Sequence, residues 1–311
     1  MDEDRLIRET LESAKLPPRM KVFLALATRE RSVAQVAALV GHGTTATGRL
    51  LSRMVGADQL TDRWEGKQHL YSIADPDLRR WSYRHLRELV GSGGCTDLGA
   101  MGERTLGHLL DYDRNAAQED LHLLLLAGHP PEEIYEHTIT PMMERVGTLW
   151  EAGQVSVAQE HFVSAQVETA LSVLFWLLAP DPADDAPAAC VCAVPGNIHN
   201  IGPRILHHYL TTDGWNVLFL DGMTPLEDLV RLVGERRMRL VGLSVATDDQ
   251  LPITIQCVEA LRVMHHPPRA IFVGGPLIRS RPDLAGQIKA DAAPGTAREA
   301  RDLARQYQTA D

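Results

Sequence analysis

Four short apolar runs, separated by stretches with helical spacing, constrain the fold of this 311-residue chain more than any other feature. Strands that are apolar on both faces and alternate with helices are typical of a parallel sheet covered by helices on both sides. We therefore expect residues 188–311 to form a flavodoxin-like (Rossmann-like) domain, with KADAAP as a fifth strand and TAREARDLARQYQ as the closing helix. The four runs are AACVCAV (188–194), WNVLFLD (215–221), RLVGLSVA (239–246) and RAIFVGG (269–275).

The middle of the chain is predicted to be all-helical. Residues 105–178 carry apolar side chains at intervals of three and four, and VSVAQEHFVSAQVETALSVLFWLLA is long and amphipathic. Helices joined by short connections predict a four-helix bundle over residues 105–180. The Gly-rich stretch 91–104 and the Pro- and Asp-rich stretch 181–187 are predicted to be linkers.

The N-terminal residues 1–90 are predicted to form a third domain. Three helical stretches follow one another from residue 18, and Ser32 is a plausible N-cap of the second while Gly41 is a plausible stop. LTDRWEGKQHLYSI then predicts two short strands around a turn. This order is the winged helix-turn-helix plan, in which the third helix enters a major groove of DNA and the hairpin touches the backbone.

The segment LALATRERS to ADPDL (24–78) resembles the ArsR-type repressor family in the order of its elements. The resemblance implies that the recognition helix and the wing contact DNA, but the family's metal-sensing cysteine pair is missing, so metal sensing is not carried over. Two arginines on a helix that Gly48 weakens make a small reading surface. The alternative is a domain that has become a dimerisation or ligand-holding module. The residues implied at the DNA are Arg49, Arg53, Arg63 and Lys67.

The charge of the chain is distributed unevenly. The net charge is −10, but residues 1–95 carry 15 Lys and Arg against 12 Asp and Glu, and the remainder carries 16 against 29. Any contact with DNA would therefore come from the N-terminal part. MDEDRLIRET lacks the features of a signal peptide, and no apolar run approaches the length that spans a membrane. We expect a cytoplasmic protein with no membrane partner.

The loop after the first predicted strand, PGNIHNIG (195–202), lies where ligands of such folds bind. Its residues 196–202 resemble the Asp-x-His-x-x-Gly motif of the cobalamin-binding family shared by methionine synthase and the mutases, with Asn197 in place of Asp. Two further signatures of this family match. Ser244-Val245-Ala246 begins 42 residues beyond Gly202, and Gly274-Gly275 begins 28 residues beyond Ala246.

The resemblance implies a cobalamin whose nucleotide tail enters the carboxyl edge of the sheet and whose cobalt takes His199 as its lower axial ligand. Ser244 would hydrogen-bond in the tail pocket, and Gly274 and Gly275 would let the backbone approach the nucleotide. Because Asn197 lacks the charge of the usual Asp, we expect a weaker or more easily lost bond between His199 and cobalt.

The helical region carries Trp150, followed ten and eleven residues later by Glu160 and His161. This spacing resembles the CarH-type cobalamin photoreceptors, which are transcriptional repressors. The resemblance implies that Trp150 covers a 5′-deoxyadenosyl group, that Glu160 binds its ribose, and that His161 is a possible upper cobalt ligand after light. The helix-turn-helix of that family is of another class than the N-terminal domain predicted here, and Glu151 stands where that family has a histidine. A core role for Trp150, with Glu160 and His161 solvated, is the alternative.

Together these resemblances predict a homo-oligomeric regulator, not an enzyme, in which photolysis of adenosylcobalamin changes the oligomeric state and DNA binding. One alternative is a stand-alone photoreceptor with a second chromophore, biliverdin, as in the photocobilins. His42, His69 and His85 would then be candidate contacts, although ordinary surface positions explain these histidines better. Another alternative is a corrinoid methyl carrier of a methyltransferase system, in which a winged helix has no role.

Overall fold

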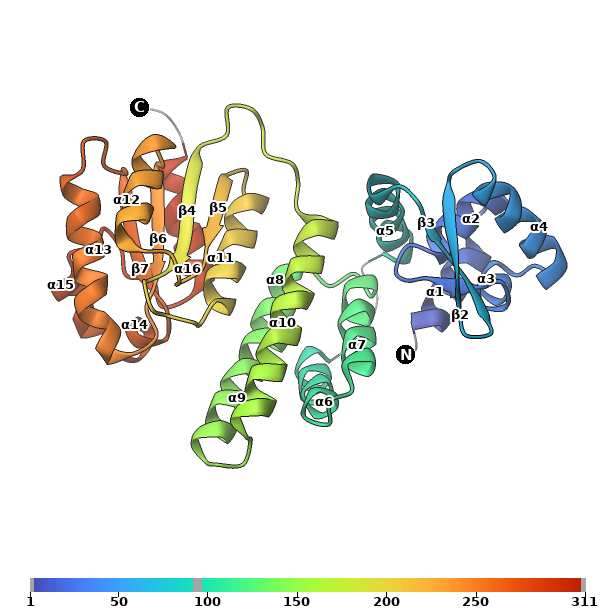
Figure 1. Ribbon diagram of the computed structural model, residues 1–311, viewed down its shortest axis with the longest axis horizontal. Coiled ribbons are helices and arrows are strands. Elements are labelled where there is room, and N and C mark those ends of the chain that lie inside the picture. The colour runs from blue at the N-terminus through green and yellow to red at the C-terminus, as the bar shows by residue number, and fades with distance from the viewer. Residues whose placement is uncertain (1–2, 92–96, 309–311) are drawn as a thin grey trace. The chain divides into compact units, whose positions relative to one another are not determined.

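The computed structural model describes residues 3–91 and 97–308 (Figure 1). The chain folds as two compact units, Met1–Leu178 and Ala179–Asp311. Each unit is described separately below.

The first unit begins with a helical head that carries a small antiparallel sheet. Strand β3 pairs with both β1 and β2, and the hairpin β2–β3 pairs Leu60 with Ile73 at its base. The helices and the hairpin predicted from residue 18 onward are all present, and two flanking helices, α1 and α5, are additional. The elements are α1 (Glu3–Ser13), α2 (Pro18–Ala25), β1 (Arg31–Ser32), α3 (Val33–Val40), α4 (Thr44–Val55), β2 (Leu60–Glu65), β3 (Gln68–Ile73) and α5 (Pro76–Val90).

Local signals explain where the helices of the head begin and end. The Ser32 side chain accepts a hydrogen bond from the Gln35 backbone and the Gln35 side chain accepts one from the Ser32 backbone, which forms a capping box at the start of α3. Gly41 ends the same helix in a left-handed conformation, with φ of 70°. The predicted N-cap and stop of this helix are therefore confirmed.

A buried ion cluster ties α1 to β1. Arg31 is fully buried, and its Nη2 lies 2.7 Å from Glu3 Oε1 and 2.8 Å from Asp4 Oδ1. Its Nη1 also donates to the Ala25 carbonyl oxygen at 2.7 Å. A buried charge with this many partners sets the position of both elements, because removing any partner would leave an uncompensated charge.

The rest of the first unit is helical. Its elements are α6 (Leu98–Leu110), α7 (Arg114–Leu126), α8 (Pro131–Ile134), the π-helical turn η1 (Tyr135–Ile139), α9 (Thr140–Glu151) and α10 (Val157–Leu178). The π turn has a local cause: Pro141 has no N–H to continue the α-helical pattern, and the Thr140 N–H bonds instead to the Tyr135 carbonyl oxygen, five residues back. The turn joins α8 to α9 without a break.

The predicted linker 91–104 is wrong beyond residue 97. Helix α6 begins at Leu98, because the Asp97 side chain caps it by accepting a hydrogen bond from the Ala100 N–H at 3.0 Å. The glycines within this helix misled the prediction, and Gly102 has a packing role there: a β-carbon would lie 3.3 Å from the Thr138 carbonyl oxygen. Residues 92–96 of the predicted linker lie outside the described residues.

Helix α5 joins the head to this helical region. Arg84 Nε donates to the Leu177 carbonyl oxygen at the end of α10, at 3.0 Å. Arg87 donates to the Leu125 and His129 carbonyl oxygens near the end of α7, at 3.2 and 3.0 Å. Helix C-termini leave carbonyl oxygens without partners inside the helix, so arginines of one helix can cap two others.

Helix α10 is long and apolar enough to span a membrane, judged by its length and composition alone, so the prediction that no segment has this property is wrong for this helix. The core helix of a folded domain passes the same test. In the first unit α10 packs against α5, α6, α7 and α9, and its buried residues include Val163, Val167 and Leu171.

The second unit is a parallel sheet with helices on both faces, which confirms the predicted Rossmann-like architecture. The strand order is β5-β4-β6-β7. Helices α11 and α16 pack on one face, around Trp215 and Phe272, and α12 and α13 pack on the other, around Val241 and Val273. The elements are β4 (Ala188–Ala193), α11 (Ile201–Thr212), β5 (Asn216–Leu220), α12 (Leu226–Glu235), β6 (Leu240–Ser244), η2 (Asp248–Gln250), α13 (Leu251–Val263), β7 (Ala270–Gly274), α14 (Pro276–Ser280), η3 (Pro282–Leu284), α15 (Ala285–Ile288), α16 (Ala297–Ala304) and η4 (Arg305–Tyr307).

The fifth strand predicted at KADAAP is wrong. Only an isolated parallel bridge joins Ala292 to Phe272. The Asp291 side chain accepts a hydrogen bond from the Ile271 N–H at 2.6 Å, so this N–H is not available to a fifth strand. Pro294 has no N–H to extend a ladder of backbone hydrogen bonds.

Candidate cofactor site

The loop after β4 is held by the carboxyl ends of its two neighbouring strands. The Val194 N–H donates to the Ser244 carbonyl oxygen at 3.0 Å, at the end of β6. The Gly196 N–H donates to the Gly222 carbonyl oxygen at 2.7 Å, just after β5. The structure therefore brings the predicted residues of the loop to Ser244, 42 residues beyond Gly202, at one edge of the sheet.

Asn197 is fully buried beneath His199 and makes hydrogen bonds of opposite kinds at the two ends of its amide. Its Nδ2 donates to the Ser244 carbonyl oxygen at 3.0 Å. Its Oδ1 accepts from the His199 backbone N–H at 3.0 Å and lies 2.9 Å from His199 Nδ1. A backbone N–H only donates and a carbonyl only accepts, so this network leaves one orientation for the amide.

The orientation of the amide decides which nitrogen of His199 can bind a metal. Because Asn197 Oδ1 is an acceptor, Nδ1 of the neutral ring carries the proton and Nε2 keeps its lone pair. The His199 residue is exposed at the surface of the second unit. One free imidazole nitrogen on an oriented ring suits a metal that brings its other ligands with it, as cobalt in a corrin does.

The paired glycines at the end of β7 are required by the protein's own backbone. Gly275 has φ of 105°, and a β-carbon there would lie 2.5 Å from the Val245 carbonyl oxygen and 2.8 Å from Ser244 Oγ. A β-carbon on Gly274 would lie 3.0 Å from the Pro294 carbonyl oxygen. Gly202, by contrast, has open space around its α-carbon. Gly274 and Gly275 thus allow neighbouring backbone segments to pack closely at this edge of the sheet, independently of any ligand.

Gly222 belongs to this site, and the sequence prediction missed it. A β-carbon there would lie 1.9 Å from the Asn197 carbonyl oxygen, so no other residue fits without moving the loop that carries His199. The signal was the Asp221-Gly222 pair directly after the second apolar run, a pair typical of turns. Its contact partner lies 25 residues earlier in the chain, and local sequence does not show such a contact.

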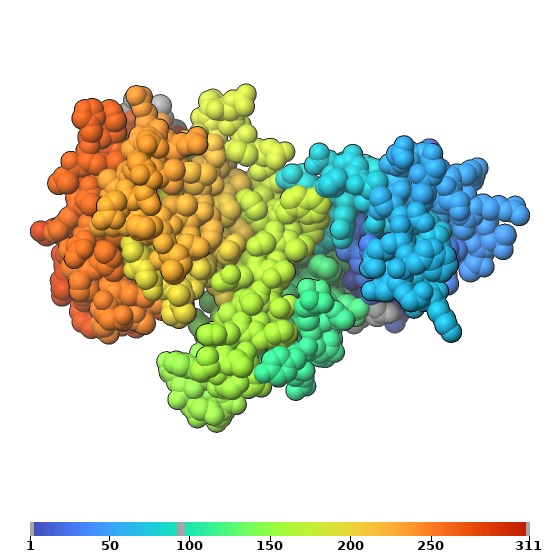
Figure 2. All heavy atoms as spheres, in the orientation of Figure 1, coloured from blue at the N-terminus to red at the C-terminus, as the bar shows by residue number. Residues whose placement is uncertain are grey.

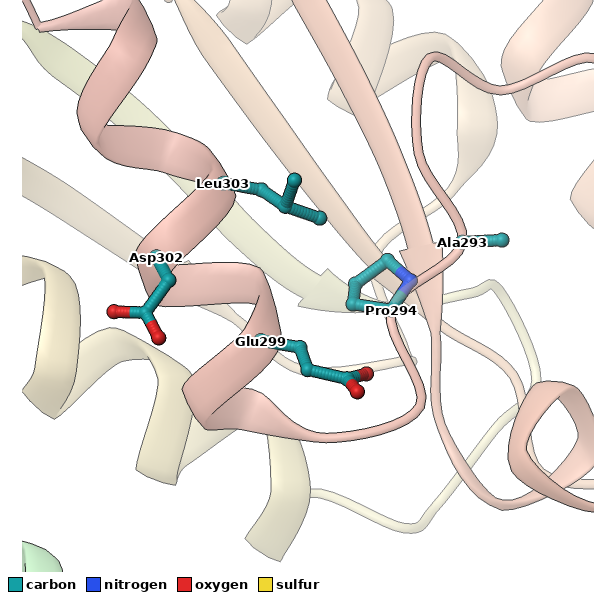
Figure 3. Close-up of a pocket in the computed structure, with 5 residues that line it drawn as sticks. All are labelled: Ala293, Pro294, Glu299, Asp302 and Leu303. Carbon is teal, nitrogen blue, oxygen red and sulfur yellow. The ribbon is translucent and has the colours of Figure 1, made fainter.

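A depression of about 510 Å³ borders the same edge of the sheet, between Pro294 and helix α16 (Figure 3). Leu303 extends from α16 toward Pro294, and the Glu299 carboxylate accepts a hydrogen bond from the Gly295 N–H at 2.7 Å. The Pro294 carbonyl oxygen is also the neighbour of Gly274. The depression therefore adjoins one predicted cofactor residue, although none of them lines it.

The residues predicted to contact an adenosyl group lie on α9 and α10 of the first unit. Trp150 is 48% exposed, so it is not a core residue of this unit. Glu160 and His161 lie in the first turn of α10; their side chains are 3.4 Å apart, and the Ser164 hydroxyl donates to Glu160 at 2.8 Å. In Figure 2 the atoms of α9 and α10 are coloured green to yellow-green. Glu151 is exposed beside Trp150.

The four basic residues predicted at DNA differ in their surroundings. Arg49 and Arg53 are exposed on α4, and Lys67 is exposed in the hairpin turn. Arg63 lies 2.7 Å from a Glu30 oxygen and 3.5 Å from a Glu65 oxygen. Its hydrogen bond to Glu30 and the charges of both carboxylates raise the pKa of its guanidinium group. The positive charge of Arg63 is therefore largely compensated by carboxylates of the head, whereas Arg49 and Arg53 present their charges to solvent.

The three histidines considered for a second chromophore all have partners within the head. His42 Nδ1 lies 2.8 Å from the Val40 carbonyl oxygen, and His85 lies 3.3 Å from Glu88. His69 lies 2.5 Å from Asp62 and stacks on Trp64 at 4.4 Å between ring centroids. Ordinary surface contacts account for all three.

Comparison with known proteins finds B12 binding domains in both units. Two models described as B12 binding domain match residues 102–175 and residues 188–304. The HTH-type transcriptional repressor CarH of Myxococcus xanthus is 30% identical over 197 residues, which cover 62% of this chain and 64% of the repressor. The chain thus matches somewhat less than two thirds of that relative's length.

Corrinoid proteins are also similar to this chain. Trimethylamine corrinoid protein 2 of Methanosarcina acetivorans is 26% identical over 156 residues, covering 50% of this chain and 72% of that protein. The solved structure of the Methanosarcina barkeri monomethylamine corrinoid protein matches with a TM-score of 0.57 at 20% identity, over 67% of this chain and 98% of that one. The structural match supports the fold of the matched residues. Both domain models begin after residue 101, so they do not extend to the head.

Proposed function

This chain belongs to the B12-binding domain family, and from that premise we propose that it is a cobalamin-binding regulator of the CarH type that controls transcription in response to light. The observation that carries the proposal is the head, residues 3–90, which lies in the same compact unit as the helical B12 module. The helix order of that head and its β-hairpin support a winged helix, and its neighbouring module supports a four-helix cap. The adenosyl form of cobalamin is part of the proposal.

The residues of the second unit fit the cofactor on their own geometry. His199 would hold the cobalt through Nε2, because Asn197 orients the ring through Nδ1. Ser244 and the glycine pair border the edge where the nucleotide tail would enter. When bound, adenosylcobalamin supplies a cobalt–carbon bond that light breaks.

The residues of the first unit supply the difference between the dark and the illuminated state. Trp150 would stack on the adenosyl group and Glu160 would hold its ribose hydroxyls, so the contacts of both residues would differ between the two states. His161 would be a candidate cobalt ligand in the illuminated state, and its contact with Glu160 would have to open for this. Arg84 of α5 binds the end of α10, the helix that carries Glu160 and His161. Arg87 of α5 binds the end of the neighbouring helix α7, so both arginines connect the helical region to the head. A change in the cap can thereby reach helix α4 and its arginines, and we propose a change in homo-oligomerisation alongside it.

A corrinoid methyl carrier is the second candidate, because the trimethylamine corrinoid protein and the monomethylamine corrinoid structure match the same two modules. A carrier of this kind would pass a methyl group to a partner enzyme and would have no use for a DNA-binding head.

The test is the absorption spectrum of the protein reconstituted with adenosylcobalamin, recorded in the dark and after illumination, with His199→Ala as the ligand control. Size-exclusion chromatography and binding to random-sequence duplex DNA are measured on the same samples. We expect light to convert the spectrum and to change both the oligomeric state and DNA affinity. Conversion of the spectrum with an unchanged oligomer and unchanged DNA binding would contradict the regulator. Transfer of a methyl group to and from the bound corrinoid would establish the carrier instead.

A further inference from the structure

We infer that the neutral amide of Asn197 positions His199, and that an aspartate at this place would not do so in this chain. The inference rests on the proposed cobalamin function, and it concerns the position at which the sequence departs from the Asp-x-His-x-x-Gly motif. By sequence alone the departure is the loss of a charge. The structure indicates instead that the loop is built around a donor that only the amide supplies.

The donor is Nδ2 of Asn197, 3.0 Å from the Ser244 carbonyl oxygen. A carboxylate has no hydrogen to offer there, so an ionised aspartate at this position would place one of its oxygens against a carbonyl oxygen. The residue is fully buried, so water cannot relieve the contact. The same carbonyl already accepts the Val194 N–H at 3.0 Å, which holds it in place at the end of β6.

The loop has little freedom to move away from this contact. The Asn197 carbonyl oxygen packs against Gly222 so closely that a β-carbon there would lie 1.9 Å from it. The Gly196 N–H is bound to the Gly222 carbonyl oxygen at 2.7 Å, and the Asn197 N–H to the Val194 carbonyl oxygen at 2.9 Å. A carboxylate at position 197 would therefore rotate its side chain or displace the loop, and either change breaks its contact with His199.

The contact with His199 is what the amide provides to the site. Oδ1 accepts from the His199 backbone N–H and faces Nδ1 of the ring, so both the position of the residue and its tautomer depend on the same oxygen. With the amide in place, Nε2 is free to bind cobalt. Without it, the ring of an exposed histidine turns freely and either nitrogen carries the proton.

The experiment compares Asn197→Asp and Asn197→Ala with the wild-type chain, with His199→Ala as the reference that lacks the ligand. Asn216→Asp is the matched control, because it makes the same chemical change at an exposed position of the second unit. The first readout needs no cofactor: nitrogen NMR of selectively labelled histidine reports the tautomer of His199. The second is the EPR spectrum of the cob(II)alamin form of the histidine-labelled protein, in which a coordinated nitrogen of the labelled imidazole changes the splitting of the cobalt lines, whereas the cofactor's own benzimidazole nitrogen does not. Cobalamin affinity and thermal unfolding are measured at pH 8 for each variant.

We expect the wild-type chain and Asn216→Asp to show the Nδ1–H tautomer and the nitrogen splitting. We expect both variants at position 197 to lose them and to bind cobalamin at least about tenfold more weakly, a change of about 1.4 kcal/mol. Nitrogen splitting in Asn197→Asp with wild-type affinity overturns the inference. If Asn197→Asp does not fold, Asn197→Ala decides, since splitting retained there shows that the amide is not needed. A wild-type chain that shows the tautomer but binds no cobalamin contradicts the proposed function and leaves the positioning role supported.

Discussion

At Gly222 and Gly275 the backbone passes so close to a neighbouring segment that there is no space for a β-carbon. The neighbours are Asn197 in one case and Ser244 with Val245 in the other. Both contacts lie at the carboxyl edge of the sheet, where loops from separate strands must share a small area. Residues that look like simple turn glycines in the sequence therefore set the distance between the loops that hold His199 and Ser244.

Substitution of Gly222 by alanine tests this at the residue scale. We expect a loss of about 3 kcal/mol in the free energy of unfolding of the second unit, at the upper end of the usual cost of overpacking, because the collision is with backbone. Urea unfolding of the full chain measures it. Gly286→Ala is the control, since its β-carbon would meet nothing within 4 Å, and we expect no loss of stability there because alanine favours the helix more than glycine does. Equal stability of the two variants would show that the loop yields easily.

At the scale of elements, helix α4 and the hairpin β2–β3 divide the basic charge of the head unequally. The hairpin carries Arg63, but Glu30 and Glu65 compensate it, and Asp62 adds a negative charge beside His69. Helix α4 carries Arg49 and Arg53, both exposed. If the head binds DNA, Arg63 contributes little to the attraction, and Arg49 and Arg53 of α4, together with Lys67 in the hairpin turn, supply most of it.

Single alanine substitutions at Arg49, Arg53 and Arg63 test this division. Affinity for random-sequence duplex DNA is measured across a range of salt concentrations. Removing one cationic side chain from a phosphate lowers the slope of log affinity against log salt by about 1. We expect that drop for Arg49→Ala and for Arg53→Ala, and a smaller one for Arg63→Ala, which serves as the matched charge control. An equal drop for all three would mean that Arg63 leaves its carboxylates when DNA binds.

At the scale of the whole molecule, both units bury ionisable groups, and burial lowers the pKa of His122 in the first unit. The first unit buries a compensated cluster around Arg31 and Glu3. The second buries His208 and, less completely, His207 on α11. Burial lowers the pKa of His208 to about 3, with the neighbouring His207 and Arg204 charges adding to the effect, and burial with Arg204 lowers the pKa of His207 to about 4. These histidines stay neutral in the folded chain well below the pH at which the unfolded chain protonates them.

As the pH falls, the free energy of unfolding of the second unit therefore decreases at pH values well above those at which its carboxylates titrate. Below about pH 6.5 the unfolded state binds protons at His207 and His208 that the folded state does not, so stability falls as the pH falls. For His208 alone we expect a loss of up to about 2 kcal/mol at pH 5. Urea unfolding between pH 7.5 and pH 5 measures the slope, which we expect to shrink in His208→Asn and to persist in the exposed control His266→Asn. An unchanged slope in His208→Asn would assign the pH dependence elsewhere.

Local sequence determined much of this molecule. Four apolar runs predicted the parallel sheet, since strands buried on both faces need apolar residues throughout. Ser32 and Gly41 predicted the ends of α3 because capping involves neighbours in the chain. The motif residues from 196 to 202, with Ser244 and Gly274-Gly275, predicted cobalamin binding through their resemblance to the cobalamin-binding family, and the two B12-binding matches agree with that. The glycines at residues 98–104 wrongly predicted a linker, because the N-cap at Asp97 stabilises the start of a helix there.

Tertiary structure decided what depends on contacts between distant residues. Only the fold places the Ser244 carbonyl beside the Asn197 amide, Gly222 against the Asn197 backbone, and Glu30 beside Arg63. It reduced the fifth strand to a bridge, because the Asp291 side chain competes for the Ile271 N–H. The physical reason is the same in each case: hydrogen bonds and steric limits act over a few ångströms in space, whatever the separation along the chain, whereas sequence patterns report mainly on neighbours within a turn or a strand.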